Sequence, residues 1–518
     1  MAQSYSVIFD KHKSIWEKHM NSYEMTVEDN KELNQIMHSS LFYLISNLPS
    51  EESNQPNGQF YGLSPGGLAK GAEGKDYQGH SFWDTEIWMH PPLLLLNPKW
   101  SEDILSYRYN VRKAAEDHAT NTTYKGYRYP WESGFTGREV TPLFAWEVIE
   151  FQHHISADIA FAYRSHLAAT HNLDWWKKYG CDIAYNTAKF WESRVQFNES
   201  TKFYDIKNIM GPDEDHYNVT NNVYTNVIAA INLYFGDFAA CSCKEELKDL
   251  DADNFAKIAK SLKMVYDEEN DFHPQFEGYE GAEIKQADVV FIGYPLQLPM
   301  NSTTKHNNLH MYDNVTRDTG PAMTWSMHTI GFLDIQDEQN AARTFRKSYS
   351  VYNHEPFKTW SENQPGVEGS GNFITGVGGF LQSVMNGYGG IRLHFDHLSI
   401  TNFYNPPSTN GLILKGITYL NNRFNLEIKN DVATVFFTDV NKDHPIKITL
   451  SPSNEEYEAK VDSPITFNRV EELIIKPENN TFGSCELKET VLNVPASAAI
   501  FKINIFIGLI AFIVILMK

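Results

Sequence analysis

Three consecutive acidic residues, Asp213, Glu214 and Asp215, follow a Gly-Pro pair near the middle of a chain of 518 residues. Because Gly-Pro does not continue a helix, we expect the acids to lie on a loop that opens into the helical pattern beginning near Asn222. Carboxylates there can simply cap the helix, since anions are favourable at an N-terminus. The Asn, His and Tyr residues that crowd the same loop suit sugar hydroxyls better than a cap requires, so Glu214 is our candidate acid.

Two earlier clusters combine aromatic and acidic side chains. The first, residues 80–92, holds Trp83 and Asp84 with a second tryptophan, a second carboxylate and two histidines, and the second holds Trp131 and Glu132. Aromatic faces pack against the apolar faces of sugar rings, and carboxylates accept protons from hydroxyls. Each cluster alone fits a buried tryptophan with surface acids equally well, so these residues are candidates for substrate binding.

Other loops add polar candidates. Lys285 and Gln286 offer a cation and an amide that could hold hydroxyls, although a solvated turn explains them as well. Glu362 precedes a glycine-dense run through residues 389–390, and glycines let the backbone approach a ligand closely. The Gly-rich loop 58–79 is longer than a helix connection needs, so we expect it to line a site too.

Helices must position these loops. Apolar residues recur at helical spacing between residues 14 and 48, which predicts one long entry helix ending at Pro49. The same spacing predicts helices near 100–118, 155–170, 174–193, 222–241, 252–265, 321–332, 338–349 and 373–385. No regular strand precedes each helix, so an α-helical toroid fits better than a parallel sheet. Alternate loops of such a ring gather at one end and form a single pit.

The pattern changes after residue 390 to short alternating segments such as 412–414, 433–437 and 446–450, which predict a small β domain. We therefore divide the chain into an entry region 1–57, a catalytic barrel 58–390, a β domain 391–497 and a hydrophobic C-terminal segment 498–518. A length of 518 residues fits one large domain with a smaller appendage. The net charge of −21 argues against binding to nucleic acid.

The cysteines indicate whether disulfides or a zinc site are expected, and the start of the chain indicates where the protein is located. Cys181, Cys241, Cys243 and Cys485 are too few and too scattered for a disulfide framework and lack the spacing of a zinc pair, so we expect neither. The start of the chain is charged and polar, with no secretory signal, which predicts a cytoplasmic protein. The sequon at Asn218 beside the candidate acid leads us to expect an unglycosylated catalytic part.

The stretch 503–517 carries the membrane signal of the sequence. It is almost entirely Ile, Phe, Leu and Val, but it is somewhat short against the roughly 20 residues that span a bilayer. A C-terminal anchor with membrane contact is therefore an open expectation. A GPI signal is disfavoured, because that route needs an entry signal.

The clusters above form five ordered motifs, namely Phe82-Trp83-Asp84-Thr85-Glu86, Trp131-Glu132-Ser133, Gly211-Pro212-Asp213-Glu214, Lys285-Gln286-Ala287-Asp288 and Trp360-Ser361-Glu362-Asn363. Their order and approximate spacing resemble glycoside hydrolase family 65. The resemblance implies a mainly α fold with an (α/α)6 barrel, an inverting mechanism, and no metal or other cofactor. It also implies release of glucose from an α-linked glucoside, with the glucosylgalactosyl disaccharide on collagen hydroxylysine as the expected substrate.

The resemblance also implies roles for single residues. Glu214 resembles the general acid and Glu362 the general base, with Glu368 as the competing choice for the base. Trp83 and Asp84 would bind the glucose in the first subsite, while Lys285, Gln286, Trp131 and Glu132 would be further substrate contacts. Inversion needs carboxyls roughly 6.5–9.5 Å apart, so that a water fits between them. The neighbours of Glu214, Asp213 and Asp215, would raise its pKa if they face it.

Three features of the chain differ from what the family usually shows, and three other functions are alternatives to hydrolysis. The family usually has a β-sandwich ahead of the barrel and a Tyr at the position of Asp215, and a hydrophobic C-terminus is not expected of it. Phosphorolysis would need a phosphate pocket of Ser, His and amides, which the loop with Glu362 lacks. Acid trehalase activity is a further alternative, and a non-catalytic, membrane-tethered glycan-binding protein is one from a different class.

Overall fold

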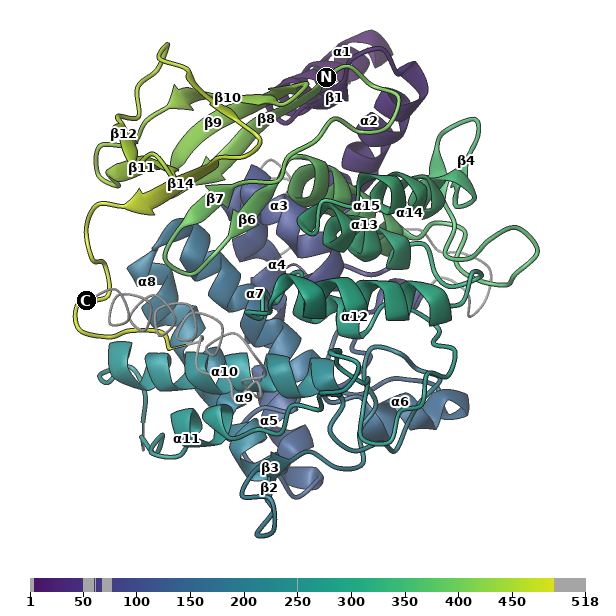
Figure 1. Ribbon diagram of the computed structural model, residues 1–518, viewed down its shortest axis with the longest axis vertical. Coiled ribbons are helices and arrows are strands. Elements are labelled where there is room, and N and C mark those ends of the chain that lie inside the picture. The colour runs from purple at the N-terminus through teal and green to yellow at the C-terminus, as the bar shows by residue number, and fades with distance from the viewer. Residues whose placement is uncertain (1–3, 50–59, 61, 68–76, 249, 489–518) are drawn as a thin grey trace, which may run out of the picture.

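The computed structural model describes residues 4–49, 60, 62–67, 77–248 and 250–488. The helices that form its body are α2 (Lys31–Ile45), α3 (His90–Leu96), α4 (Pro98–Asn110), α5 (Arg112–Asn121), α6 (Trp146–Phe151), α7 (Ile155–Thr170), α8 (Leu173–Trp175), α9 (Cys181–Arg194), α10 (Val223–Ser242), α11 (Phe255–Lys260), α12 (Ser302–Val315), α13 (Thr324–Asp334), α14 (Glu338–Ser350) and α15 (Ile374–Gln382). The helices make up the body of the molecule, and a strand-rich region lies against its upper end in Figure 1.

The ring is built of two layers, as an (α/α)6 barrel requires. The helices α3, α7, α10, α13 and α15 are buried along nearly their whole length, which is typical of a helix enclosed on all sides. They alternate along the chain with helices that bury a single stripe. In α14, for example, the buried residues are Ala341, Thr344, Phe345 and Ser348, which follow helical spacing along one face. The predicted helical toroid is therefore confirmed.

Most predicted helices are found, and three were missed: α3, α6 and α12. The helix α7 occupies the predicted range, and α10 and α14 lie within one residue of theirs. The helix α12 was missed because its sequence is largely polar and buries little besides Leu309 and Tyr312. The helix α3 was missed because its run of proline and leucine has no periodicity. The predicted helix 252–265 shortens to α11.

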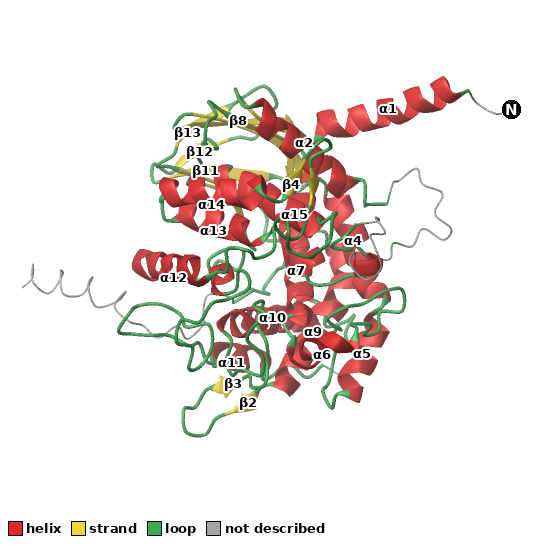
Figure 2. Ribbon diagram, turned by 90° about the vertical axis from the view of Figure 1, so that its right-hand side faces the viewer, coloured by secondary structure: helices red, strands yellow, loops and turns green. Residues whose placement is uncertain are grey.

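The single long entry helix was a wrong prediction. The chain forms α1 (Tyr5–Ser22), then the strand β1 (Met25–Val27), and only then α2. Asn30 begins α2, because its side chain accepts a hydrogen bond from the Leu33 amide at 3.0 Å. The residues of β1 follow the helical spacing poorly and instead pair with a distant strand. Figure 2 shows α1 extending away from the body, and none of its residues is buried.

The small β domain is confirmed and consists of two five-stranded antiparallel sheets. Its strands are β6 (Ile391–Leu393), β7 (Leu398–Ile400), β8 (Leu412–Tyr419), β9 (Asn422–Lys429), β10 (Val432–Asp439), β11 (Ile446–Ser451), β12 (Glu455–Tyr457), β13 (Ile465–Asn468) and β14 (Glu472–Pro477). One sheet has the order β1-β8-β9-β10-β13 and the other β12-β11-β14-β7-β6. Since Met25 pairs with Leu414, the entry region contributes an edge strand to this domain. The four-part division of the chain remains our proposal.

The expectation that the four cysteines form no disulfide framework was wrong. Cys181 is bonded to Cys243 and Cys241 to Cys485, across 62 and 244 positions of the sequence. The helix pair α9 and α10 brings the first two together, and the second bond fastens the segment after β14 to α10. Such long-range pairs leave no local spacing signal, which is why the sequence did not show them.

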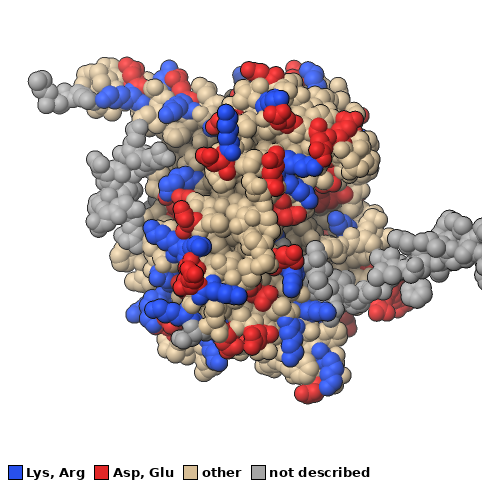
Figure 3. Space-filling view, turned by 90° about the vertical axis from the view of Figure 1, so that its left-hand side faces the viewer, with Lys and Arg blue, Asp and Glu red and all other residues tan. Residues whose placement is uncertain are grey.

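Two further expectations concern the surface and the C-terminus. On the face in Figure 3, acidic and basic side chains are interspersed rather than gathered by sign. Within the described ranges no helix is both long and apolar enough to cross a membrane. The segment 503–517 lies outside the described residues, so the membrane contact stays a prediction from sequence.

Candidate active site

Loops from one end of the ring surround a cavity of about 660 Å³. All eight side chains that the sequence singled out as catalytic or substrate-binding candidates line it: Trp83, Asp84, Trp131, Glu132, Glu214, Lys285, Gln286 and Glu362. Tyr77 and Glu368 line it too. The cavity is the pit expected from the alternating loops, and it places candidates from five separate stretches around one space.

The loop with Glu214 is fixed by backbone packing against the start of α10. Asn222 caps this helix, and its side-chain oxygen accepts from the Thr225 amide at 2.8 Å. A Cβ atom at Gly211 would lie 2.2 Å from Nδ2 of Asn222 and 2.5 Å from Oδ2 of Asp288. A side chain at position 211 would therefore displace the Asn222 and Asp288 side chains that hold this loop.

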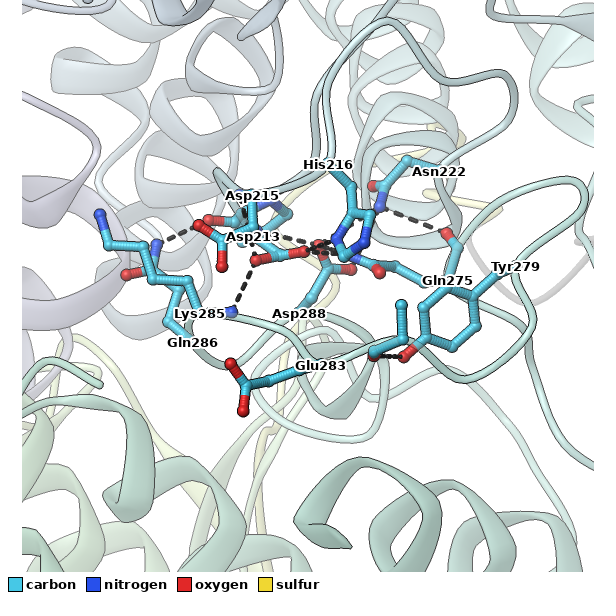
Figure 4. Close-up of polar contacts among 12 residues, drawn as sticks. Asp213, Asp215, His216, Asn222, Gln275, Tyr279, Glu283, Lys285, Gln286 and Asp288 are labelled. Atoms are coloured by element: carbon cyan, nitrogen blue, oxygen red, sulfur yellow. Dashed lines mark hydrogen bonds and ion pairs between the residues drawn. The ribbon is translucent and has the colours of Figure 1, made fainter. Parts of the chain in front are cut away.

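Asp213 holds this loop together and does not face the pit. Its side chain is fully buried and accepts hydrogen bonds from Nδ1 of His216 at 2.6 Å, Nε2 of Gln275 at 3.0 Å and the Lys285 amide at 2.8 Å (Figure 4). The Asp213 amide donates to Asp288, whose pKa burial raises to about 6. Asp213 is thus the anchor between two loops.

Glu214 points toward a cation. Nζ of Lys285 lies 2.8 Å from Oε2 of Glu214. Burial acts to lower the pKa of Lys285, but attraction to Glu214 and the hydrogen bond between them raise it overall. On the next residue, Asp215 pairs with Arg317, which also donates to Glu283 at 3.0 Å. The carboxylates of Asp213 and Asp215 are therefore engaged with residues other than Glu214.

Glu362 is held at both carboxylate oxygens. The phenol of Tyr77 donates to Oε1 at 2.7 Å, and the Ser370 amide donates to Oε2 at 2.9 Å. The rival carboxylate, Glu368, is exposed on the same loop, and its backbone carbonyl accepts from Nδ2 of Asn363 at 2.6 Å. A fixed, half-buried carboxylate suits a base better than an exposed one, so this geometry favours Glu362.

The floor of the pit is aromatic with one buried acid. Trp83 is 2% exposed and meets His154 and Phe291 edge-on, with ring centroids 4.9 and 5.7 Å apart. Asp84 accepts from Oγ1 of Thr375 at 2.7 Å. Burial raises the pKa of Asp84 to about 7, against the lowering effect of that hydrogen bond, and the negative charges of the two glutamates add to the rise.

The residues along the side of the cavity make hydrogen bonds to other parts of the chain that the sequence did not indicate. Nδ1 of His80 lies 2.6 Å from Oε1 of Glu132, and burial raises the pKa of Glu132. The Trp131 amide donates to Oε2 of Glu139 at 2.8 Å. Gln286 is 2% exposed, and its Nε2 donates to the Pro212 carbonyl at 2.6 Å. One N–H of its amide group therefore joins two loops.

Charged pairs beneath the floor were not predicted. The guanidinium of Arg108 donates to Glu86 at 2.7 and 3.1 Å, with both side chains buried. Asp158 accepts from Tyr224 at 2.7 Å and lies 2.6 Å from Nδ1 of His154. The spacing of His154 and Asp158, one helical turn apart, could have indicated a pair. The pairs Arg108–Glu86 and Tyr224–Asp158, which are 22 and 66 positions apart, could not be read from local patterns.

Tyr77 also went unnamed at the sequence level, although it lies in the Gly-rich loop 58–79 that we expected to line a site. The described parts of that loop are 60, 62–67 and 77–79, and of these Tyr77 and Gln78 line the cavity. As for metals, no cluster of three or more His, Cys, Asp or Glu side chains suited to an ion occurs among the described residues.

Comparison with known proteins adds independent findings. The model of the glycosyl hydrolase family 65 central catalytic domain matches residues 67–284. A protein-glucosylgalactosylhydroxylysine glucosidase from Dictyostelium discoideum is 41% identical over 400 residues, covering 76% of this chain and 54% of the relative. The protein of the same name from Danio rerio is 33% identical over 446 residues, covering 85% and 67%. The chain thus spans between about half and two thirds of the length of these relatives.

A solved structure supports the fold. It is provisionally assigned as a kojibiose phosphorylase from the human microbiome, and it superposes with a TM-score of 0.73 at 20% identity, covering 90% of this chain and 66% of that one. At this identity the likeness concerns the fold alone.

Proposed function

The chain belongs to glycosyl hydrolase family 65, and from this premise we propose that its pit hydrolyses an α-linked glucoside with inversion. The observation that carries the proposal is the pair of carboxylates, Glu214 and Glu362, on separate loops of one cavity. Glycoside hydrolysis with inversion uses two such groups, one to protonate the leaving oxygen and one to activate a water.

The proposed reaction needs no group beyond these side chains. Glu214 gives its proton to the glycosidic oxygen as the bond to the anomeric carbon breaks. Glu362 takes a proton from the water that attacks the opposite face of the same carbon, so the released glucose has inverted configuration. Trp83 and Asp84 would bind the glucose ring, since an aromatic face and a carboxylate fit its apolar face and its hydroxyls. Lys285 would orient Glu214 through the 2.8 Å contact.

The substrate is the finer part of the proposal. The relatives from Dictyostelium discoideum and Danio rerio are named for glucosylgalactosylhydroxylysine, and this disaccharide on collagen is the substrate we propose. A cavity of about 660 Å³ is large enough for a disaccharide on the general scale of small-molecule sites. Acid trehalase activity would use the same pit with another glucoside.

Phosphorolysis is the rival within the family. We predicted from the sequence that the loop of Glu362 holds no Ser-His phosphate pocket. Nε2 of His354 and Oγ of Ser361 do lie 2.8 Å apart. Neither residue lines the cavity, whereas Glu362 does. Because the loop that would have to form a phosphate pocket brings the Glu362 carboxylate to the cavity instead, we favour hydrolysis.

The experiment is glucose release from glucosylgalactosyl-hydroxylysine by the wild type, with and without inorganic phosphate. We expect phosphate-independent release of free glucose, slowed by about 10³-fold in the Glu362→Gln variant. Release of glucose 1-phosphate only with phosphate would identify a phosphorylase instead. A Glu214→Gln variant that binds the disaccharide as tightly as the wild type, with neither protein releasing glucose, would identify a glycan-binding protein.

Location is also part of the proposal. The sequence predicted a cytoplasmic protein with membrane contact through residues 503–517, which no described residue tests. Disulfides persist in oxidising compartments. The pairs Cys181–Cys243 and Cys241–Cys485 therefore weigh against the cytoplasm, and we propose an oxidising compartment.

A further inference from the structure

Tyr77 lies on the wall of the pit, and its phenol donates to Oε1 of Glu362 across 285 positions of the sequence. We propose that Tyr77 is a positioning residue for the base, holding the Glu362 carboxylate in the orientation in which it takes a proton from the attacking water. This inference rests on the proposed function and adds to it a residue that no sequence motif marks.

The two donors to Glu362 leave room for a water. Tyr77 occupies one site on Oε1 at 2.7 Å, and the Ser370 amide occupies one on Oε2 at 2.9 Å. A carboxylate oxygen has two acceptor sites, so each oxygen keeps one for a further donor. A Cβ atom at Gly369 would lie 3.1 Å from Oε2, so the backbone also approaches the carboxylate closely there. Donors on both oxygens fix the plane of the carboxylate.

Tyr77 is suited to be a permanent donor. Burial raises its pKa well above 10, and the negative charge of Glu362 and the hydrogen bond to it raise the pKa further, as do Asp84 and Glu214. The phenol therefore keeps its proton at every working pH. The ring packs edge-on against Phe82 with centroids 5.2 Å apart and lies 6.2 Å from the ring of Phe373. The hydroxyl is thus held in place by its aromatic neighbours.

The backbone at Tyr77 is strained. Tyr77 has a φ of 57° and Gln78 one of 51°, both in the left-handed region, followed by Gly79 at 76°. Side chains at positive φ cost free energy, and such conformations persist where the surroundings over-determine them. The run directs the Tyr77 ring into the pit, where the hydrogen bond to Glu362 is made. A residue that only filled space would not need this conformation.

The test removes the hydroxyl and keeps the ring. In Tyr77→Phe we expect kcat to fall by about 10- to 100-fold while KM changes by less than about threefold, since the lost donor acts on the base and not on the bound sugar. In the Glu362→Gln background the same change should lower kcat little further. The effects of substitutions at residues that act through one another are not additive. A merely structural tyrosine would lower activity equally in both backgrounds.

The matched control is Tyr43→Phe. Tyr43 donates to the Phe357 carbonyl at 2.7 Å and does not line the cavity, so its loss should leave kcat unchanged. Thermal unfolding of both variants checks that each is folded. The inference is overturned if Tyr77→Phe keeps the wild-type kcat, or if its loss is the same with Gln at position 362. If Glu362→Gln itself keeps full turnover, the proposed function fails and the inference with it, which distinguishes the two failures.

Discussion

Nζ of Lys285 lies 2.8 Å from Oε2 of Glu214, although the two residues are 71 positions apart in the chain. The contact exists because Asp213, next to Glu214, accepts from the Lys285 amide at 2.8 Å and so aligns the two loops side by side. The residue that we propose to orient the acid is therefore a cation from another loop, and the neighbouring acids of the same loop contact other partners.

This contact predicts that Lys285→Met lowers kcat by at least about tenfold, because the Glu214 carboxyl loses the group that orients it. Lys285→Arg, which keeps the charge, should recover part of the rate. The control is Lys263→Met, since Lys263 makes a similar ion pair with Glu277 at 2.7 Å outside the cavity lining. Equal rates for Lys285→Met and the wild type would contradict the role assigned to the contact.

The second prediction compares the two glutamates of the loop 362–368 as candidates for the base. We expect Glu362→Gln to lower kcat by about 10³-fold, within the range for loss of an acid-base group. Glu368→Gln should stay within about threefold of the wild type, because its side chain is exposed. Steady-state rates on the same α-glucoside measure both. The reverse ranking would assign the base to Glu368.

The sequence predicted elements well where periodicity or alternation is strong. The helices α7 and α10 and the strands β8, β10 and β11 lie where their patterns indicated. Periodicity failed where burial is sparse, as in α12, or where the pattern runs across a break, as between α1 and α2. A helical period over 14–48 did not reveal that Met25 to Val27 pair with β8, because that partner is distant in the chain.

In the candidate site, too, local motifs could be predicted from the sequence, whereas contacts between distant residues could not. Motifs chosen for side-chain chemistry fell on loops at one end of the barrel, so Glu214, Glu362, Trp83 and Asp84 line one cavity. Their partners were not predictable. Tyr77 and Glu362 are 285 positions apart, and the cysteine pairs are 62 and 244 apart. Contacts at such separations are decided by how the whole ring closes and leave no local signal.

Asp84 predicts a pH dependence of stability. It ionises near 3.8 in an unfolded chain, whereas burial raises its pKa to about 7 in the folded protein. Between these values the folded state holds a proton that the unfolded state has lost, so the contribution of Asp84 to stability falls as pH rises from about 4 to 7. The full effect of a shift of this size is about 4 kcal/mol.

The measurement is denaturant unfolding of Asp84→Asn against the wild type. Asn is neutral at every pH and can still accept from Thr375, so the variant should gain about 1–4 kcal/mol on the wild type between pH 4 and pH 8. The exposed Asp443→Asn is the control and should show no such trend. If the difference in the free energy of unfolding between the two proteins stayed constant with pH, or shrank as pH rises, burial of an ionised Asp84 would not destabilise the fold as we expect.

The disulfides give a prediction independent of catalysis. Alkylation of the denatured, unreduced protein should label none of the four cysteines, and all four after reduction. Replacing Cys241 and Cys485 together by serine should lower stability by about 2–5 kcal/mol, because their bond closes a long loop of 244 positions. The pit should keep its activity in that variant at 25 °C. Labelling of all four thiols before reduction would contradict both pairs.

The most direct test of the central claim is proton NMR of the glucose anomer as it forms from glucosylgalactosyl-hydroxylysine. Inversion by Glu214 and Glu362 predicts β-glucose first, followed by slow mutarotation to the equilibrium mixture. The same spectrum should be obtained with or without phosphate. If α-glucose appeared first, the two carboxylates could not act on opposite faces of the sugar as proposed, and the mechanism would be contradicted.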